Sequence, residues 1–165
     1  MRSFNHRAIT LATGRIGVIS DTHGLVRAEA LAALRNSELI IHAGDIGRPE
    51  VLSALEQIAP VLAIKGNNDR GAWARNLPDI LSVSVNAIGV YVIHNVNDLK
   101  IKPANIESQV VISGHSHKPS VAIRDGVLFI NPGSAGQRRF KLPVSVARFN
   151  IQREKRQVKI VEIKI

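Results

Sequence analysis

Residues 15–24 of the chain read RIGVISDTHG. Residues 16–19 form a short apolar run with β-branched side chains, as expected of a strand that is buried on both faces. The run stops at Asp21 and His23, a carboxylate and an imidazole two residues apart. The carboxyl ends of strands are where α/β proteins build their binding sites. A carboxylate oxygen and an imidazole nitrogen at such a place suit a metal ion such as Mn, Fe, Zn, Ni or Co. The alternative is a polar turn in which Asp21 caps a helix.

The length and composition of the chain narrow the class of protein. Its 165 residues fit one domain, which we expect over residues 15–165 after a weakly ordered extension over residues 1–14. The chain has no Cys, which argues against a disulfide-built secreted protein. No apolar run approaches the roughly 20 residues of a membrane span. We therefore expect a cytoplasmic protein with no membrane partner.

The charge of the chain favours anionic partners. The formal net charge is +9, which suits phosphate esters or nucleic acid, although a well-solvated basic surface is an alternative reading. Aromatic residues make up only 4% of the chain, so platforms on which nucleic-acid bases could stack are scarce.

A repeated strand–loop–helix pattern fills the first half of the chain. Predicted strands over residues 16–19, 38–42 and 61–64 alternate with predicted helices over residues 25–36 and 49–58. Each strand gives way to a Gly-containing loop that carries Asp or Asn. The pattern predicts a parallel α/β sheet.

The pattern changes in the second half, where strands follow one another with turns between them. They are predicted over residues 80–85, 90–94, 109–113, 121–123, 127–130, 144–151 and 158–165. We expect this half to be mostly antiparallel. Two sheets packed together, with helices outside, would accommodate both halves.

Seven polar residues with metal-ligand chemistry follow five predicted strands. They are Asp21, His23, Asp45, Asn67, His94, His115 and His117. Single members have structural alternatives, since Asp45 could cap a helix and His94 could be a satisfied core histidine. Two imidazoles in one Gly-led loop, as at His115 and His117, rarely serve packing only. Together the seven predict a site for two metal ions.

The order D-x-H, G-D, G-N-x-D, H and G-H-x-H resembles the calcineurin-like metallophosphoesterases. The stretches ISDTHG, IHAGD, KGNND, GHSHKP and NPGS, within residues 15–134, are most similar to the small single-domain bacterial and archaeal phosphodiesterases. The retromer scaffold subunit of eukaryotes belongs to the same branch. The resemblance implies an α/β fold, a four-layer αββα sandwich of two mixed β-sheets flanked by helices.

The resemblance also implies the roles of the site residues. One divalent metal ion would be held by Asp21, His23, Asp45 and His117. A second would be held by Asp45, Asn67, His94 and His115. Manganese is the expected metal, with nickel, iron, zinc, cobalt and magnesium as alternatives. The reaction implied is hydrolysis of a phosphate ester, foremost a diester, by a hydroxide shared between the two ions. The catalytic residues would be Asp45, Asn67, Asn68 and His94.

Two positions depart from the family pattern. Many members have His directly after G-N, where this chain has Asn68, and many have Gly after the ligand of the fourth motif, where this chain has Asn95. Among the neighbours of the predicted ligands, Asp69 is expected to orient a ligand. His42 either supports the ligands or packs in the core. Residues 131–134 are expected to shape the loop beside the site.

Three functions are therefore open, of which the phosphoesterase is the leading one. The alternative is a non-catalytic scaffold of the retromer type, which binds a protein partner through an exposed apolar surface. The third is an enzyme or binder of nucleic acid, motivated by Arg138, Arg139, Lys141 and the cluster over residues 153–156. A small phosphate ester is the expected substrate, and association into a homo-oligomer is left open.

Overall fold

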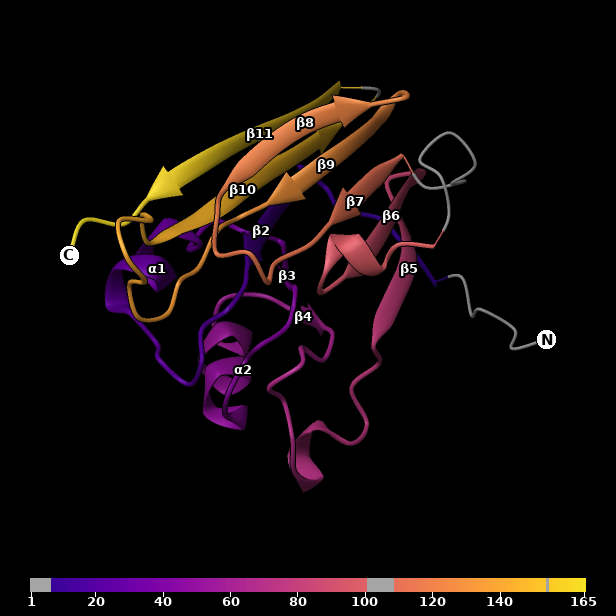
Figure 1. Ribbon diagram of the computed structural model, residues 1–165. Helices are drawn as coiled ribbons and strands as arrows, with labels where there is room; N and C mark the ends of the chain where they lie inside the picture. Colours follow the sequence, from indigo (N-terminus) through magenta and orange to yellow (C-terminus); the bar gives the residue numbers. More distant parts are fainter. Residues whose placement is uncertain (1–6, 101–108, 154) are drawn as a thin grey trace.

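Two β-sheets pack face to face in the computed structural model, which describes residues 7–100, 109–153 and 155–165 (Figure 1). The five-stranded sheet has the order β11-β10-β2-β3-β4. Its strands are β2 (Arg15–Ile19), β3 (Leu39–His42), β4 (Val61–Ala63), β10 (Ser145–Gln152) and β11 (Lys155–Glu162). The six-stranded sheet has the order β1-β5-β6-β7-β9-β8. Its strands are β1 (Arg7–Ile9), β5 (Ile80–Val85), β6 (Ile88–Ile93), β7 (Val110–Ile112), β8 (Ser120–Arg124) and β9 (Val127–Asn131).

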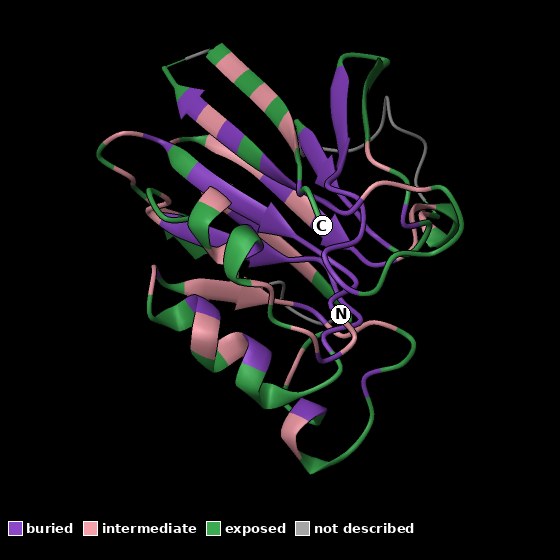
Figure 2. Cartoon of the chain, turned by 90° about the vertical axis from the view of Figure 1, so that its left-hand side faces the viewer, coloured by how far each residue is buried: buried purple, intermediate pink, exposed green. Residues whose placement is uncertain are grey.

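The main core lies between the two sheets. Val18 and Ile41 reach into it from the five-stranded sheet, and Val92 and Ile112 reach into it from the six-stranded sheet. Strand β3 is buried along its whole length, and Figure 2 shows buried strands through the middle of the molecule. Burial on both faces explains why the first strands read as continuous apolar runs rather than as alternating ones.

Helices cover the outer face of the five-stranded sheet. Side chains of α1 (Ala28–Ala33) and α2 (Pro49–Glu56) form a second core with the outward-facing Ile40 of β3 and Val146 of β10. The six-stranded sheet carries a thinner cover in the described residues, where the 3₁₀ turn η2 (Val96–Asp98) adjoins a small cluster around Phe129. The predicted α/β sandwich of two mixed sheets is confirmed. The described helices, including the short η1 (Ala72–Ala74), are all too short to span a membrane.

The first helix is shorter than predicted. The predicted helix over residues 25–36 is confined to Ala28–Ala33. Leu25 still belongs to a turn, in which its N–H donates to the carbonyl of Thr22 at 2.9 Å. Arg27, at the N-cap position, is extended and offers no capping side chain, so no local signal starts the helix earlier.

The second half of the chain is mostly antiparallel, as predicted, and the exception is β7. β7 runs parallel to β6 on one side and to β9 on the other. The parallel pairings of β7 were not predicted, because the sequence does not show that β6 and β7 are joined by a crossover instead of a hairpin. After β7 the chain goes to the edge of the sheet as β8, then returns antiparallel as β9 between the two.

Residues 7–14, predicted to belong to a weakly ordered extension, instead join the fold. β1 pairs in parallel with the end of β5, and residues 1–6 lie outside the described residues. The carboxylate of Glu38 accepts hydrogen bonds from the N–H groups of Ala12 at 2.9 Å and Thr13 at 2.7 Å. These contacts are between segments far apart in sequence, which is why local composition does not reveal them.

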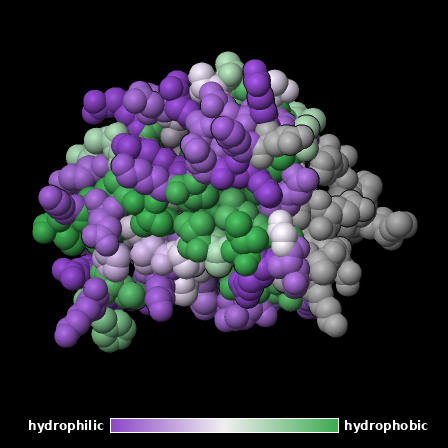
Figure 3. Space-filling view, turned by 90° about the horizontal axis from the view of Figure 1, so that it is seen from above, coloured by the Kyte–Doolittle hydropathy of each residue, from purple (hydrophilic) through white to green (hydrophobic). Residues whose placement is uncertain are grey.

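An apolar patch is exposed where the two sheets end together. β8 and β11 are edge strands, and Figure 3, which views the molecule from above, shows apolar atoms gathered on this face between polar borders. On β8, Val121 is 45% exposed and Ile123 is 72% exposed. Their cross-strand partners on β9 belong to the main core, so both side chains are on its face of the sheet. Val158 and Ile160 of β11 pack against the main core and are only partly buried. The sandwich is therefore open at this end.

Two phenylalanines in opposite surroundings test the role of the main core. Phe149 is 1% exposed between the sheets, whereas Phe140 is 94% exposed. We expect Phe149→Ala to lower the free energy of unfolding by about 3–5 kcal/mol, because it leaves a cavity in a packed core. The control Phe140→Ala should change it by less than about 0.5 kcal/mol. Urea titration measures both, and similar values for the two variants would contradict this account of the core.

Candidate metal centre

The carboxyl ends of five strands from both sheets meet at one place, and all seven predicted ligands lie there. Asp21 and His23 follow β2, Asp45 follows β3, Asn67 follows β4, His94 follows β6, and His115 and His117 follow β7. Neither sheet alone supplies the site. Its assembly therefore depends on the packing of the two sheets.

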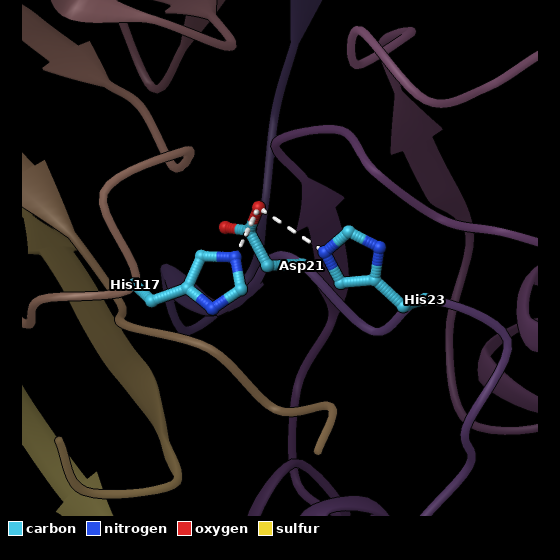
Figure 4. A group of neighbouring side chains, drawn as sticks. All are labelled: Asp21, His23 and His117. Atoms are coloured by element: carbon cyan, nitrogen blue, oxygen red, sulfur yellow. Dashed lines mark ion pairs between the residues drawn. The ribbon is translucent and has the colours of Figure 1, made fainter. Parts of the chain in front are cut away.

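The two oxygens of the Asp21 carboxylate have different surroundings. Oδ2 accepts hydrogen bonds from Ser20 Oγ at 2.6 Å and from the backbone N–H of His115 at 3.0 Å. Oδ1 has no hydrogen-bond partner. It faces Nε2 of His117 at 3.4 Å and Nε2 of His23 at 4.0 Å (Figure 4). In Figure 4 the two rings lie on either side of the carboxylate. One oxygen is thus fixed by the protein, and the other is free to bind a cation.

His94 and Asp45 form the adjoining part of the site. His94 Nε2 lies 3.4 Å from Oδ2 of Asp45 and 3.9 Å from Oδ1 of Asp21. On the other side of the ring, Nδ1 lies 2.7 Å from the carbonyl oxygen of Ala43, which can only accept, so Nδ1 carries a hydrogen. In the neutral ring, Nε2 then presents a lone pair toward two carboxylates. A cation or a proton between them is needed to make this arrangement favourable.

His115 and Asn67 complete the set on the exposed side. The rings of His115 and His94 lie 5.2 Å apart between centroids. His115 Nδ1 lies 3.3 Å from Oδ1 of Asn67. The structure therefore brings all seven predicted ligands into one continuous cluster.

The donor atoms of the cluster fit divalent metal ions. Two sets have donor atoms that all lie within 4.8 Å of one another: Asp21 with His23 and His117, and Asp21 with Asp45 and His94. Four buried polar atoms lack a hydrogen-bond partner, namely Asp21 Oδ1, His23 Nε2, His94 Nε2 and His117 Nδ1. Buried polar atoms are nearly always paired, so such a gathering of unpaired atoms fits a cation-binding site. Mixed carboxylate and imidazole donors suit a first-row transition metal.

Both buried carboxylates are ionised. Burial alone would raise the pKa of Asp21, but the neighbouring His117 and the hydrogen bond from Ser20 outweigh burial, and the net pKa is lowered. Burial likewise opposes ionisation of Asp45, yet contacts with His94 and the N–H of Asn68 lower the pKa of this carboxyl. Negative charge is therefore available for a cation without prior loss of a proton.

The chain after β4 holds Asp45 in place. The backbone N–H and side-chain Nδ2 of Asn68 donate to its two carboxylate oxygens at 2.9 and 3.0 Å. The carboxylate of Asp69 accepts from the N–H groups of Ile46 at 3.0 Å, Gly47 at 2.9 Å and Gly66 at 2.9 Å. Asp69 thus fixes the loops after β3 and β4 together, in keeping with its predicted orienting role.

His42 is both buried and bonded to residues beside the ligands. Its Nδ1 accepts the N–H of Gly44 at 3.1 Å, so the neutral ring carries its hydrogen on Nε2. Nε2 lies 3.0 Å from Oγ1 of Thr22, which in turn donates to the carbonyl of Ile46 at 2.8 Å. Complete burial lowers the pKa of His42 to about 4, and the ring stays neutral near pH 7. This chain of bonds joins the loop after β2 to the loop after β3.

Five of the seven predicted ligands have a left-handed backbone. The φ angles are +54° at Asp21, +46° at His23, +57° at Asp45, +70° at His115 and +61° at His117. This conformation is unfavourable by roughly 1–2 kcal/mol per residue for most L-residues. The glycine before His115 allows a further close approach, since a Cβ on Gly114 would collide with Oγ of Ser20. The backbone of these loops is therefore strained at the residues whose side chains it directs into the cluster.

Sequence reasoning did not identify Ser20 and Thr22, which lie next to predicted ligands in the sequence and hold their loops. The hydrogen bond from Ser20 to Asp21 had a local signal, because the hydroxyl directly precedes the carboxylate at the strand end. The link between Thr22 and His42 had none, since it joins residues 20 positions apart.

Comparisons with known proteins agree with this geometry. Residues 15–154 match the model of the calcineurin-like phosphoesterase superfamily domain. A relative in Methanothermobacter thermautotrophicus, described as a probable metallophosphoesterase, is 34% identical over 158 residues, which cover 88% of this chain and 91% of the relative. A phosphodiesterase of Methanocaldococcus jannaschii is 30% identical over 139 residues, which cover 72% of this chain and 82% of that protein. The crystal structure of Vps29 from Chaetomium thermophilum superposes with a TM-score of 0.73 at 17% identity, covering 90% of this chain and 96% of that one, which shows a shared fold.

Replacing a strained ligand by glycine should stabilise the metal-free protein. We expect His115→Gly to raise the free energy of unfolding, measured with a chelator present, by about 1 kcal/mol, because glycine adopts positive φ freely. His115→Ala removes the same ring but keeps the strain, so it should bring no such gain. Equal stabilities of the Gly and Ala variants in urea titration would contradict the account of strain.

The neutral state of His42 predicts how stability depends on pH. Its pKa falls from 6.5 to about 4 on folding, so the unfolded chain binds the proton more readily. The stabilisation is complete above pH 6.5 and is lost as the pH falls toward 4, by about 3 kcal/mol in total. We expect the metal-free His42→Gln variant to lack this part of the pH dependence. Parallel urea titrations at pH 7 and pH 4.5 measure it, and an unchanged difference between the two pH values would disprove it.

Proposed function

The chain belongs to the calcineurin-like phosphoesterase superfamily, and we propose that it is a phosphodiesterase that uses two divalent metal ions. The observation that carries the proposal is the Asp45 carboxylate, whose Oδ2 lies 3.7 Å from His23 Nε2 and 3.4 Å from His94 Nε2. These two histidines belong to different halves of the cluster. These two distances support the proposal that Asp45 serves two cations at once.

Two sets of residues would hold the ions. Asp21, His23, Asp45 and His117 would hold one of them. Asp45, Asn67, His94 and His115 would hold the other. Divalent ions at such a site supply Lewis acidity and lower the pKa of water into the neutral range. Manganese remains the expected metal, because carboxylate, amide and imidazole donors are all present.

The residues of the chain itself hold the site in shape and attract substrate. Asn68 and Asp69 fix the Asp45 carboxylate and its loop, and Ser20 fixes Asp21, so the donor atoms need little reorganisation. The formal net charge of +9 attracts an anionic ester.

Asn68 supports a diester rather than a monoester as substrate. Its side chain can donate a hydrogen bond but cannot release a proton to a leaving alkoxide. A diester with an aryl leaving group needs that help least, since the leaving group is stable as an anion. The name of the related phosphodiesterase from Methanocaldococcus jannaschii is in keeping with this choice.

A protein-binding scaffold remains the second candidate function. The observation that favours it is the apolar patch at the open end of the sandwich, where Ile123 is 72% exposed. The complete set of metal-ligand side chains weighs against it, because a scaffold does not need them. Absence of turnover in a metal-loaded, folded protein would favour the scaffold.

Loss of the shared carboxylate should abolish turnover. We expect metal-loaded protein to hydrolyse bis(p-nitrophenyl) phosphate, and Asp45→Asn to lower kcat/KM by more than about 100-fold, because two cations would lack the charge that screens them. Asp125→Asn makes the same chemical change in the exposed turn after β8 and serves as the control. Circular dichroism checks folding, and elemental analysis checks metal content. Full turnover of Asp45→Asn at unchanged metal content would refute the shared role.

A proton donor at residue 68 should shift the substrate preference. We expect Asn68→His to raise kcat/KM for an alkyl phosphomonoester by about 100-fold or more, relative to its effect on an aryl diester. The gain should follow the pH dependence of a group that titrates near neutral pH. Asn68→Gln, which also lacks a transferable proton, is the control. If wild-type protein already favours the alkyl monoester, the diester assignment is wrong.

A further inference from the structure

We propose that the loop over residues 136–142 is a binding site for single-stranded nucleic acid, in which the ring of Phe140 stacks on a base and the neighbouring cations bind phosphates. The inference rests on the proposed phosphodiesterase function and names the class of diester as an oligonucleotide. It makes Phe140 a residue that determines substrate specificity.

Phe140 is exposed to a degree that folding does not explain. Its side chain is 94% exposed, whereas the other described aromatic residues, Trp73, Tyr91, Phe129 and Phe149, are buried or half-buried. A fully exposed benzyl group adds nothing to the hydrophobic core, and its burial against a ligand would be favourable. Its surroundings indicate what kind of ligand that is.

The backbone presents Phe140 at the tip of a tight turn. The N–H of Leu142 donates to the carbonyl of Arg139 at 3.1 Å, which leaves Phe140 and Lys141 at the two central positions. The φ angle of Phe140 is +54°, a conformation that favours Gly or Asn and is uncommon for a bulky residue. Arg138 Nε donates to the carbonyl of Leu142 at 3.2 Å and holds the turn closed. Strained residues of this kind gather at functional sites.

The loop that carries Phe140 begins in contact with the backbone of Asp21, a predicted metal ligand. Ser134 Oγ donates to the carbonyl of Asp21 at 3.0 Å, and a Cβ on Gly136 would collide with the carbonyls of Asp21 and Thr22. Arg27 donates to the carbonyl of Gly136 through Nη2 at 3.1 Å. Phe140 follows Gly136 by four residues, so their Cα atoms are at most about 14 Å apart. A strand whose phosphate lies at the metal centre can therefore reach Phe140 with a base a few nucleotides away.

The charges around Phe140 favour a nucleic acid over a neutral or cationic partner. Arg139 and Lys141 flank the ring in sequence, both are exposed, and neither forms an ion pair with an acid within the part of the chain described. An aromatic ring between cations is the combination that binds single strands, since bases stack on the ring and phosphates meet the charges. A protein partner would be indicated by wider apolar surface around the ring, but Arg139 and Lys141 flank it, and Leu142 is the one other large apolar residue of the loop.

Kinetics with matched substrates separate stacking from charge. The substrates are short oligothymidylates with a p-nitrophenyl phosphate ester at one end, the same strands with abasic nucleotides, and bis(p-nitrophenyl) phosphate. We expect Phe140→Ala to lower kcat/KM for the thymidylates by about 10- to 100-fold, through KM. The values for the abasic strands and for bis(p-nitrophenyl) phosphate should stay unchanged. Phe140→Trp should restore the thymidylate value, and Phe140→Leu, which is apolar but not aromatic, should not.

Binding to the metal-free protein gives a second measurement that does not depend on turnover. Fluorescence anisotropy with labelled oligothymidylate should show weaker binding for Phe140→Ala. The variant with Arg139→Ala and Lys141→Ala should lower the slope of log K against log salt by about 1.4, as expected for two lost contacts to a single strand. Labelled RNA of the same length tests whether the sugar matters.

The outcomes distinguish this inference from the proposed function. Equal kcat/KM for thymidylate and abasic strands, with bis(p-nitrophenyl) phosphate hydrolysed, would overturn the stacking site and leave the phosphodiesterase in place. If Phe140→Ala weakened all three substrates equally, the residue would have a structural role only, which also overturns the inference. No hydrolysis of any diester would overturn both.

Discussion

The metal centre depends on a difference in hydrogen bonding between the two carboxylate oxygens of Asp21. Ser20 and the backbone of His115 hold one oxygen at 2.6 and 3.0 Å, and the other faces the imidazoles without a partner. Ser20 and Asp21 follow a strand of one sheet, and His115 follows a strand of the other. The hydrogen bond between His115 and Asp21 therefore forms only when the sandwich is closed. The site is a consequence of sheet packing as much as of its own residues.

The sequence predicted the cluster well because its signals are local. Each ligand follows directly on an apolar strand, and in a parallel sheet the ends of neighbouring strands lie side by side. What it did not predict depends on contacts between distant segments. The pairing of β1 with β5 and the parallel pairing of β6, β7 and β9 depend on which strands meet in space. The spacing of apolar residues along the sequence does not indicate which strands will pair. The left-handed backbone of the ligands was likewise hidden, since Asp and His are enriched in this conformation but adopt it only in a minority of cases.

The surroundings of the site keep its charges in a defined state. His42 is neutral because it is buried, and its hydrogen is fixed on Nε2 by the N–H of Gly44. The carboxylate of Asp69 accepts hydrogen bonds from three backbone N–H groups of the loops after β3 and β4. Asp21 and Asp45 also accept hydrogen bonds, but Oδ1 of Asp21 has no partner, and both carboxylates face the imidazoles of the cluster. A cation there meets two carboxylates that form no ion pair with Lys or Arg within the described residues.

The left-handed ligands also bear on how such a protein can change over generations. At Asp21, His23, Asp45, His115 and His117, the residue that serves the metal is not the one that the backbone conformation favours. In a lineage that no longer needed the metal, mutation of His23, His115 or His117 to glycine or asparagine would relieve the strain of the backbone. Decay of the site would then be quick and would begin in the loops, while the sheets stayed as they are. A descendant of this fold can thus lose its chemistry and become a more stable platform by the same few substitutions.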